Sequence, residues 1–161
     1  MANPDRPSGA APHGVPLRVN SYVAGGAVYP DDLVTLNSSG LVVAAAASQD
    51  LLGAARGFAA ASGDQISVAD HPDQQFVIQA DETEIDAQTD VGQNANILAT
   101  AGNSTYKVSR MELDSSTIAS DSTLPLRILG IEAAVDNAFG AQAKCIVRIN
   151  RHQLAPNTQG V

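Results

Sequence analysis

The apolar residues of this chain occur in short runs separated by turn-forming residues, and this pattern constrains the fold more than any other feature. Leu33–Leu36 is followed by Asn37–Gly40 and then by Leu41–Val43, which predicts two strands joined by a glycine-containing turn. Leu124–Ile131 and Ala143–Asn150 flank another turn-rich stretch and predict a further strand pair. The chain is therefore expected to be all-β.

Two more β-rich runs lie in the middle of the chain. Gln65–Ala69 and Gln74–Gln79 are separated by a short segment that contains Pro72. Because proline has no backbone N–H to donate to a sheet, Pro72 marks the connection between two strands.

Three other segments are less regular. Ser48 and the two residues after it resemble a helix start, but Gly53 and Gly57 would each cost a helix about 1 kcal/mol, so a glycine-kinked strand is favoured over a helix. The polar stretches Asp81–Asp86 and Asp114–Thr117 are expected in loops.

The side chains available for a core are mostly small. The hydrophobic fraction is 44%, yet the chain has three Phe, three Tyr and no Trp. Alternation in the last strand predicts which residues face inward, namely Cys145, Val147 and Ile149, and which face outward, namely Lys144, Arg148 and Asn150. Cys145 is the only cysteine, so an intramolecular disulfide is excluded, and its burial would make it inert.

Residues 1–20 differ from the rest because they contain four prolines and no regular periodicity. This composition favours an extended arm, with an unstructured terminus as the alternative. We expect residues 21–154 to form the β domain and residues 155–161 to form a C-terminal tail. The start of the chain has no apolar core typical of a secretory signal, and the stretch Leu41–Ala61 is too interrupted to span a membrane.

The net charge of −8 and the sequence pI near 4.5 predict repulsion from polyanions. Nucleic acid and anionic membranes are therefore not expected as partners. Glycine-rich phosphate-binding motifs do not occur, the acidic stretch from Asp81 to Asp90 does not match the EF-hand pattern, and the three histidines are scattered. No cofactor or metal is expected.

The segment Asp70-His71-Pro72-Asp73 allows two interpretations. Asp70 and His71 could form an acid–base pair of a small hydrolase, because a neighbouring carboxylate raises the pKa of a histidine. A turn with side-chain hydrogen bonds to its own backbone explains the same residues more simply. Since no serine or cysteine nucleophile has an identifiable base, we do not expect an enzyme.

Four motifs in series resemble the capsid cement, or head decoration, proteins of tailed bacteriophages. They span residues 27–154 and comprise Tyr29-Pro30-Asp31-Asp32-Leu33-Val34, the segment from Asp70 to Asp81, Glu112-Leu113-Asp114-Ser115-Ser116 with Leu126-Arg127-Ile128-Leu129-Gly130, and the segment from Asp136 to Leu154. The family pattern has glycine where this chain has Asp31.

This resemblance implies a non-enzymatic virion protein with a small β-barrel, tulip-like or sandwich domain. Such proteins sit on the outer surface of the head, commonly as homotrimers, and clamp neighbouring copies of the major capsid protein. The alternative from another class is a surface-displayed carbohydrate-binding β-sandwich, although few aromatic residues are available for a glycan platform.

The N-terminal arm is the expected capsid-binding element, because it offers little to a core and exposes an open backbone. Arg6 and Arg18 are expected to donate to acidic residues of the shell. Deletion of residues 2–18 is accordingly expected to leave the β domain folded. The predicted interface residues are Asp5, Arg6, Pro7, His13, Val15, Pro16 and Arg18.

Overall fold

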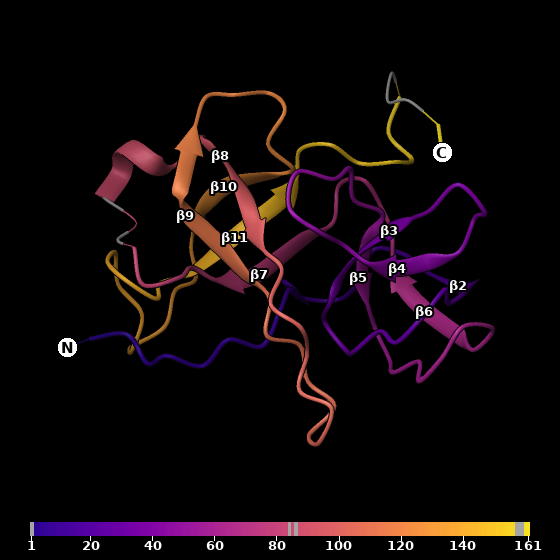
Figure 1. The fold of residues 1–161 in the computed structure, drawn as a ribbon. Coiled ribbons are helices and arrows are strands. Elements are labelled where there is room, and N and C mark those ends of the chain that lie inside the picture. Colours follow the sequence, from indigo (N-terminus) through magenta and orange to yellow (C-terminus); the bar gives the residue numbers. More distant parts are fainter. Residues whose placement is uncertain (1, 84, 86, 157–159) are drawn as a thin grey trace.

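Two curled antiparallel sheets stand side by side along the molecule, one from each half of the chain (Figure 1). The computed structural model describes residues 2–83, 85, 87–156 and 160–161. We call the unit built from strands β2 to β6 the first lobe and the unit built from β7 to β11 the second lobe. The prediction of an all-β fold is confirmed.

The first lobe contains five strands in the spatial order β2-β6-β5-β3-β4. Its open edges meet where Ala24 bridges Val42 in parallel orientation and the Gly25 N–H donates to the Val42 carbonyl at 2.7 Å. The sheet therefore curls into a small barrel. The strands are β2 (Val19–Val23), β3 (Leu33–Leu36), β4 (Val42–Ala44), β5 (Gly53–Ala55) and β6 (Gln65–Ala69).

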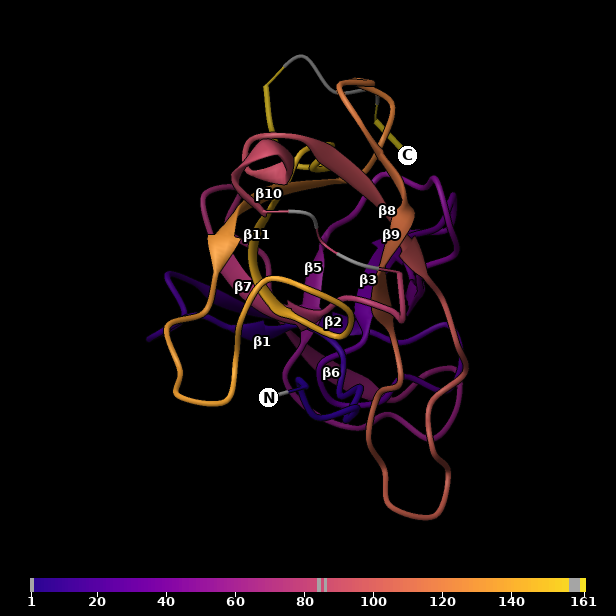
Figure 2. The same cartoon turned by 90° about the vertical axis from the view of Figure 1, so that its left-hand side faces the viewer.

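The second lobe has the spatial order β7-β11-β10-β8-β9, and Figure 2 shows these strands following one another around a ring. Ala80 and Leu113 form the parallel bridge that joins its edges. The short strand β1 (Ala11–Pro12) pairs with the outer side of β7. The remaining elements are β7 (Gln75–Gln79), η1 (Ala87–Asp90), β8 (Asn94–Leu98), β9 (Glu112–Ala119), β10 (Leu126–Ile131) and β11 (Lys144–Ile149).

The two lobes repeat one topology. In each lobe the first strand lies beside the fifth, which is followed by the fourth, the second and the third, and a parallel bridge joins the third strand to the first. The last strand of each lobe is followed by a histidine with the same turn contact. The Nδ1 atoms of His71 and His152 accept N–H groups from Asp73 and Leu154, each at 3.0 Å.

The core consists mainly of small aliphatic side chains, as the composition predicts. One buried cluster fills the first lobe around Val34, Leu52 and Val68. A larger cluster fills the second lobe around Phe76 and extends to Leu33 of the first lobe. The lobes therefore share a continuous core.

The inward-facing residues predicted for the last strand are buried in β11. Cys145 and Val147 have no exposed surface, and Ile149 is 5% exposed. Burial raises the pKa of the Cys145 thiol to about 12, which keeps the sulfur protonated and unreactive at neutral pH.

The predicted strand pairs β3–β4 and β10–β11 are confirmed. The prediction of a loop at Asp114–Thr117 is wrong, because these residues lie within edge strand β9. The Asp114 carboxylate accepts hydrogen bonds from the Ser116 backbone and hydroxyl, whereas Ser115 is buried and its hydroxyl has no partner among the described residues. Ser116 is exposed, as a polar residue at the edge of a sheet can be.

Gly53 allows β5 to approach β6 closely. A Cβ atom at this position would lie 2.0 Å from the backbone oxygen of Ala69, which cannot move away without breaking the sheet. At Gly130 in β10 of the other lobe, an added Cβ would meet no atom within 4 Å.

We predict that Gly53→Ala lowers the free energy of unfolding by at least about 2 kcal/mol, because the methyl group overlaps backbone. Gly130→Ala is the matched control and should change it by less than about 1 kcal/mol. Urea denaturation of both variants measures these changes. Equal losses of unfolding free energy would contradict the close approach of β5 to β6 at Gly53.

His152 joins the end of β11 to the first lobe. Leu51 donates its N–H to the Arg151 carbonyl, and the Gln153 N–H donates to the Leu51 carbonyl, each at 2.9 Å. His152 itself is 2% exposed, and its Nε2 atom is buried. Burial lowers the pKa of His152 from 6.5 to about 4, since a second proton would leave a charge inside the protein.

We predict a loss of stability on acidification that depends on His152. In the unfolded chain this residue binds a proton as the pH falls through 6.5, whereas in the folded chain it stays neutral until about pH 4. Lowering the pH from 7.5 to 5 therefore reduces the free energy of unfolding by about 2 kcal/mol. Urea titrations of wild type and His152→Gln across this range check the value. If the free energy of unfolding of the variant falls with pH as steeply as that of wild type, other groups cause the loss.

Candidate functional site

The N-terminal arm lies along the second lobe. The Asn3 side chain donates to the carbonyls of Ala138 and Ala141 at 2.8 and 2.9 Å, and the Arg6 N–H donates to Oε1 of Gln79 at 2.8 Å. β1 then extends the sheet beyond β7. The arm is therefore held by its own chain from Asn3 onward.

Gly9 and Ala10 anchor this arm most tightly. Gly9 has a φ of 78°, and an added Cβ would lie 2.2 Å from the Asp31 carbonyl. The Ala10 N–H donates to that same carbonyl, and the Ala10 side chain is fully buried in the core. The expectation that the arm offers little to the core is therefore wrong at this point.

Asp31 itself adopts a φ of 67°, in the left-handed region that favours glycine. This is the position at which the cement-protein pattern has glycine. Here the aspartate forms an ion pair with Arg56 at 2.6 Å.

Arg18 points inward to a buried carboxylate. Its Nε donates to Oδ1 of Asp70 at 2.7 Å, and its Nη2 donates to the Asp70 carbonyl at 3.1 Å. Asn20 and Tyr22 donate to the other carboxylate oxygen. The expectation that Arg18 offers its donors to a capsid is wrong for these two nitrogen atoms.

Asp70 stays ionised although it is completely buried. Burial is the largest single influence and opposes ionisation, but hydrogen bonds from Tyr22, Arg18 and Asn20 together hold the pKa of Asp70 below its ordinary 3.8. Burial and the Asp70 contact raise the pKa of Tyr22 to about 12. The carboxylate therefore ties β2 to the connection between the lobes.

His71 does not face this carboxylate as a base. Its Nδ1 accepts the Asp73 N–H at 3.0 Å, as in a simple turn, while the oxygens of Asp70 point to residues of β2. The geometry therefore favours the turn interpretation of this segment.

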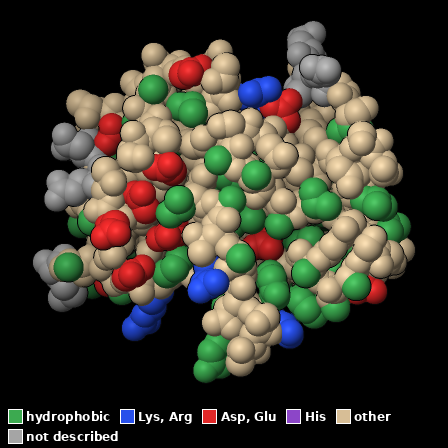
Figure 3. All heavy atoms as spheres, viewed as in Figure 1, with side chains coloured by type: hydrophobic (Ala, Val, Ile, Leu, Met, Phe, Trp, Pro, Cys, Tyr) green, Lys and Arg blue, Asp and Glu red, His purple; other side chains and the backbone are tan. Residues whose placement is uncertain are grey.

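The structure separates the other predicted interface residues into three places. Asp5 and Pro7 line an acidic groove of about 250 Å³ with Asp81, Glu82 and Glu112. Burial, followed by the charges of Asp5 and Asp81, raises the pKa of Glu112. Acidic side chains also gather elsewhere on this lobe (Figure 3).

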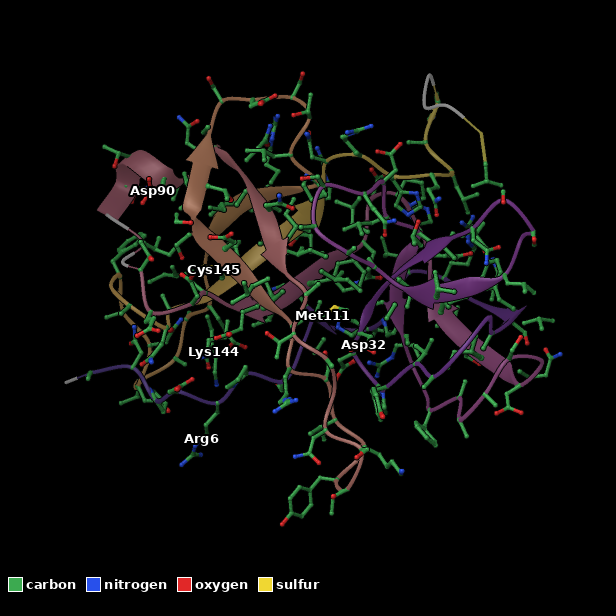
Figure 4. All side chains as sticks on the ribbon, in the orientation of Figure 1. Arg6, Asp32, Asp90, Met111, Lys144 and Cys145 are labelled. Atoms are coloured by element: carbon green, nitrogen blue, oxygen red, sulfur yellow. The ribbon has the colours of Figure 1, made fainter. Side chains whose placement is uncertain are left out.

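Arg6 and His13 share a second groove of about 270 Å³ with Lys144 of β11. Figure 4 shows Arg6 pointing away from the body of the protein below Lys144. Glu132 also lines this groove, and neither Arg6 nor Lys144 forms an ion pair within the described part of the chain. Sequence analysis missed Lys144 because it comes from a distant strand.

The third place is an apolar stripe, which we define as Val15, Leu17, Val19 and Val23. These side chains are 85%, 59%, 46% and 37% exposed. Val15 and Leu17 also line a shallow hollow of about 190 Å³ with His13. Pro16 lies half-buried between them. Leu17, Val19 and Val23 were not among the interface residues predicted from the sequence. Their even spacing, which places residues on one face of a strand, was the signal that could have found them.

No group of His, Cys, Asp or Glu among the described residues is arranged to hold a metal ion. Glu84 and Asp86 of the acidic stretch lie outside these residues. No helix in the described ranges is long and apolar enough to cross a membrane.

We predict that Arg18 is required for stability rather than for external contacts. Arg18→Met removes the ion pair and one donor from the buried Asp70 carboxylate and one donor from the Asp70 carbonyl, and it should cost roughly 1–3 kcal/mol. Arg6→Met, in the same arm but without an ion pair among the described residues, should cost less than about 0.5 kcal/mol. Thermal denaturation compares them, and equal stability would contradict the role assigned to Arg18.

Deletion of residues 2–18 removes both Ala10 and Arg18, so a folded truncated domain is no longer expected. Comparison with known proteins adds no further constraint, because no family model, curated protein or solved structure matches this chain.

Proposed function

We propose that this chain is a non-enzymatic cement protein that binds the outer surface of a tailed-bacteriophage head and clamps neighbouring major capsid subunits. The observation that carries the proposal is the apolar stripe, which begins in the arm at Val15 and continues along β2 to Val23. Four aliphatic side chains within nine residues of sequence are exposed there, two of them, Val15 and Leu17, in one hollow, and exposed apolar surface is typical of protein contact sites. The resemblance of the four sequence motifs supplies the class of partner.

The groove that contains Arg6, His13 and Lys144 adds a polar rim to this contact. Arg6 and Lys144, which form no ion pair among the described residues, suit acidic side chains of a shell subunit although the net charge of the chain is −8. An apolar centre with a charged rim is the usual composition of a protein interface.

Repetition of this contact would supply the affinity. A capsid presents each binding site many times, and a homotrimer of this chain would engage several sites together. Linked contacts bind about 10²–10⁴ times more tightly than one contact, so each apolar stripe needs only a modest affinity for the shell. The trimer is part of the proposal.

The alternative of carbohydrate binding has little aromatic surface to use, because the chain has three Phe, three Tyr and no Trp. Tyr29 and Phe58 pack on each other with ring centroids 5.4 Å apart, and Nζ of Lys107 lies 4.8 Å from the Phe58 centroid. Tyr106 is 76% exposed, and Phe58 and Phe139 are each 39% exposed. The preference for a capsid partner over a glycan therefore rests on the four sequence motifs.

Quantitative mass spectrometry of particles produced by the genome that encodes this chain tests the proposal. We expect the chain in stoichiometric proportion to the major capsid protein in purified heads. Absence from purified heads would overturn the assignment.

A variant series then tests the stripe. Particles stripped of the chain are incubated with wild type, with Leu17→Ser and Val19→Ser combined, or with Val135→Ser. Val135 is fully exposed in the connection between β10 and β11 and serves as the matched control. The double variant should bind at least tenfold more weakly, about 1.4 kcal/mol, and the control should bind as wild type. Equal binding by all three would place the contact elsewhere.

A further inference from the structure

Basic side chains gather on the outer face of the sheet in the second lobe. Alternation along β11 buries its odd-numbered residues, so Lys144 and Arg148 point outward. Arg127 of β10 lies directly opposite Arg148 in the register of the two strands. We call Lys144, Arg148 and Arg127 the basic face.

The two arginines of the basic face lie side by side without a carboxylate. Like charges that are directly opposite each other in neighbouring strands destabilise a sheet. None of the three cations forms an ion pair within the part of the chain that the structure describes. Elsewhere the chain pairs Arg18, Arg56 and Arg151 with aspartates. The repulsion on the basic face is therefore not offset by an acidic side chain of the described residues.

Arg127 is held in position before any partner binds. Its Nε donates to Oδ1 of Asn94 at 2.9 Å, and its Nη2 donates to Oδ1 of Asn150 at 3.4 Å. Both acceptors are neutral amides, so they orient the guanidinium without cancelling its charge. Arg148 beside it is exposed. A guanidinium that is already oriented loses less conformational freedom when it binds a carboxylate.

The basic face is continuous with both hollows of the proposed capsid contact. In the register of β11 with β7, Lys144 lies opposite Gln79 and Arg148 lies opposite Gln75. Gln79 lines the groove that also contains Lys144, and Gln75 lines the hollow in the apolar stripe. Lys144 and Arg148 are four residues apart on one strand, which corresponds to about 13 Å. The basic face therefore connects the groove to the hollow.

We propose that the basic face binds an acidic segment of the major capsid protein, with one carboxylate between Arg127 and Arg148 and another beside Lys144. The inference rests on the proposed function and adds the chemistry of the partner surface. Guanidinium groups form strong paired N–H···O bonds with carboxylates. A carboxylate between the two arginines would also replace their repulsion by attraction to a shared negative charge.

A nucleic-acid strand fits this face less well than an acidic protein segment. Glu132 lines the groove with Lys144, and Asp73 lines the hollow with Gln75, so a carboxylate is present near each end of the face. A phosphate backbone that continued past either end would be repelled, and the net charge of −8 adds to this repulsion. A protein segment needs only a few carboxylates and can be neutral beyond them.

The melting temperature of Arg148→Gln separates a binding role from a structural role. Removal of one of two facing positive charges should raise the melting temperature of the free protein by roughly 1–3 °C. Arg110→Gln is the matched control, because Arg110 is exposed in the connection between β8 and β9 and forms no ion pair among the described residues. It should not raise the melting temperature. A lower melting temperature for Arg148→Gln would overturn the proposal, since the arginine would then stabilise the fold.

Binding of the same variants to particles stripped of the chain tests the partner. Arg148→Gln should bind at least tenfold more weakly than wild type, although it is the more stable protein, and Arg110→Gln should bind as wild type. Added salt should weaken wild type more than Arg148→Gln. Equal binding by Arg148→Gln and wild type would overturn the acidic contact and leave the cement function standing, whereas absence of the chain from purified heads overturns the function itself.

A soluble probe tests the same chemistry without the shell. The full-length protein is titrated with tetraglutamate, with tetraserine, both acetylated and amidated, or with a single-stranded DNA oligonucleotide, and the backbone amides are followed by NMR. Tetraglutamate should shift the amides of Arg127 and Arg148, tetraserine should not, and Arg148→Gln should weaken the tetraglutamate response at least tenfold. Tighter binding of the oligonucleotide than of tetraglutamate, or no binding of tetraglutamate at millimolar concentration, would overturn the proposal.

Discussion

The buried carboxylate of Asp70 is the interaction on which the arrangement of this protein depends. It lies in the short connection from the first lobe to the second, and Arg18, Asn20 and Tyr22 converge on it from alternate positions of one segment. A buried charge is tolerated only when it is fully paired, so this contact fixes the start of β2 against the connection. The arm leading to β2 is thereby placed along the second lobe, and the apolar stripe is placed on the outside.

The sequence predicted the local elements better than their assembly. Short apolar runs identified β3, β4, β10 and β11, and alternation identified the buried face of β11, because these signals depend only on nearby residues. The repeated topology of the lobes was not predictable, since strands such as β2 and β6 pair although about forty residues of sequence separate them. β9 was missed because the polar run Asp114–Thr117 is typical of a loop, and its pairing with β8 depends on residues distant in the sequence.

The candidate interaction surface was predicted only in part, because the sequence does not show which side chains find partners within the fold. Composition correctly singled out the proline-rich segment as unusual, but it gave no sign that Gly9 fits against the Asp31 carbonyl or that Ala10 enters the core. Prolines remove backbone donors without preventing such packing. Arg6 and His13 lie at the surface near Lys144, whereas Arg18 is used internally, and only the partner of each side chain distinguishes these roles.

A cryo-electron microscopy map of intact heads carrying this chain tests the central claim most directly. We expect density for the double-lobed protein on the outer surface, with Leu17 and Val19 against the major capsid protein and the groove of Arg6 and Lys144 at the edge of that contact. Density in which the stripe faces solvent, or a shell without this chain, would contradict it.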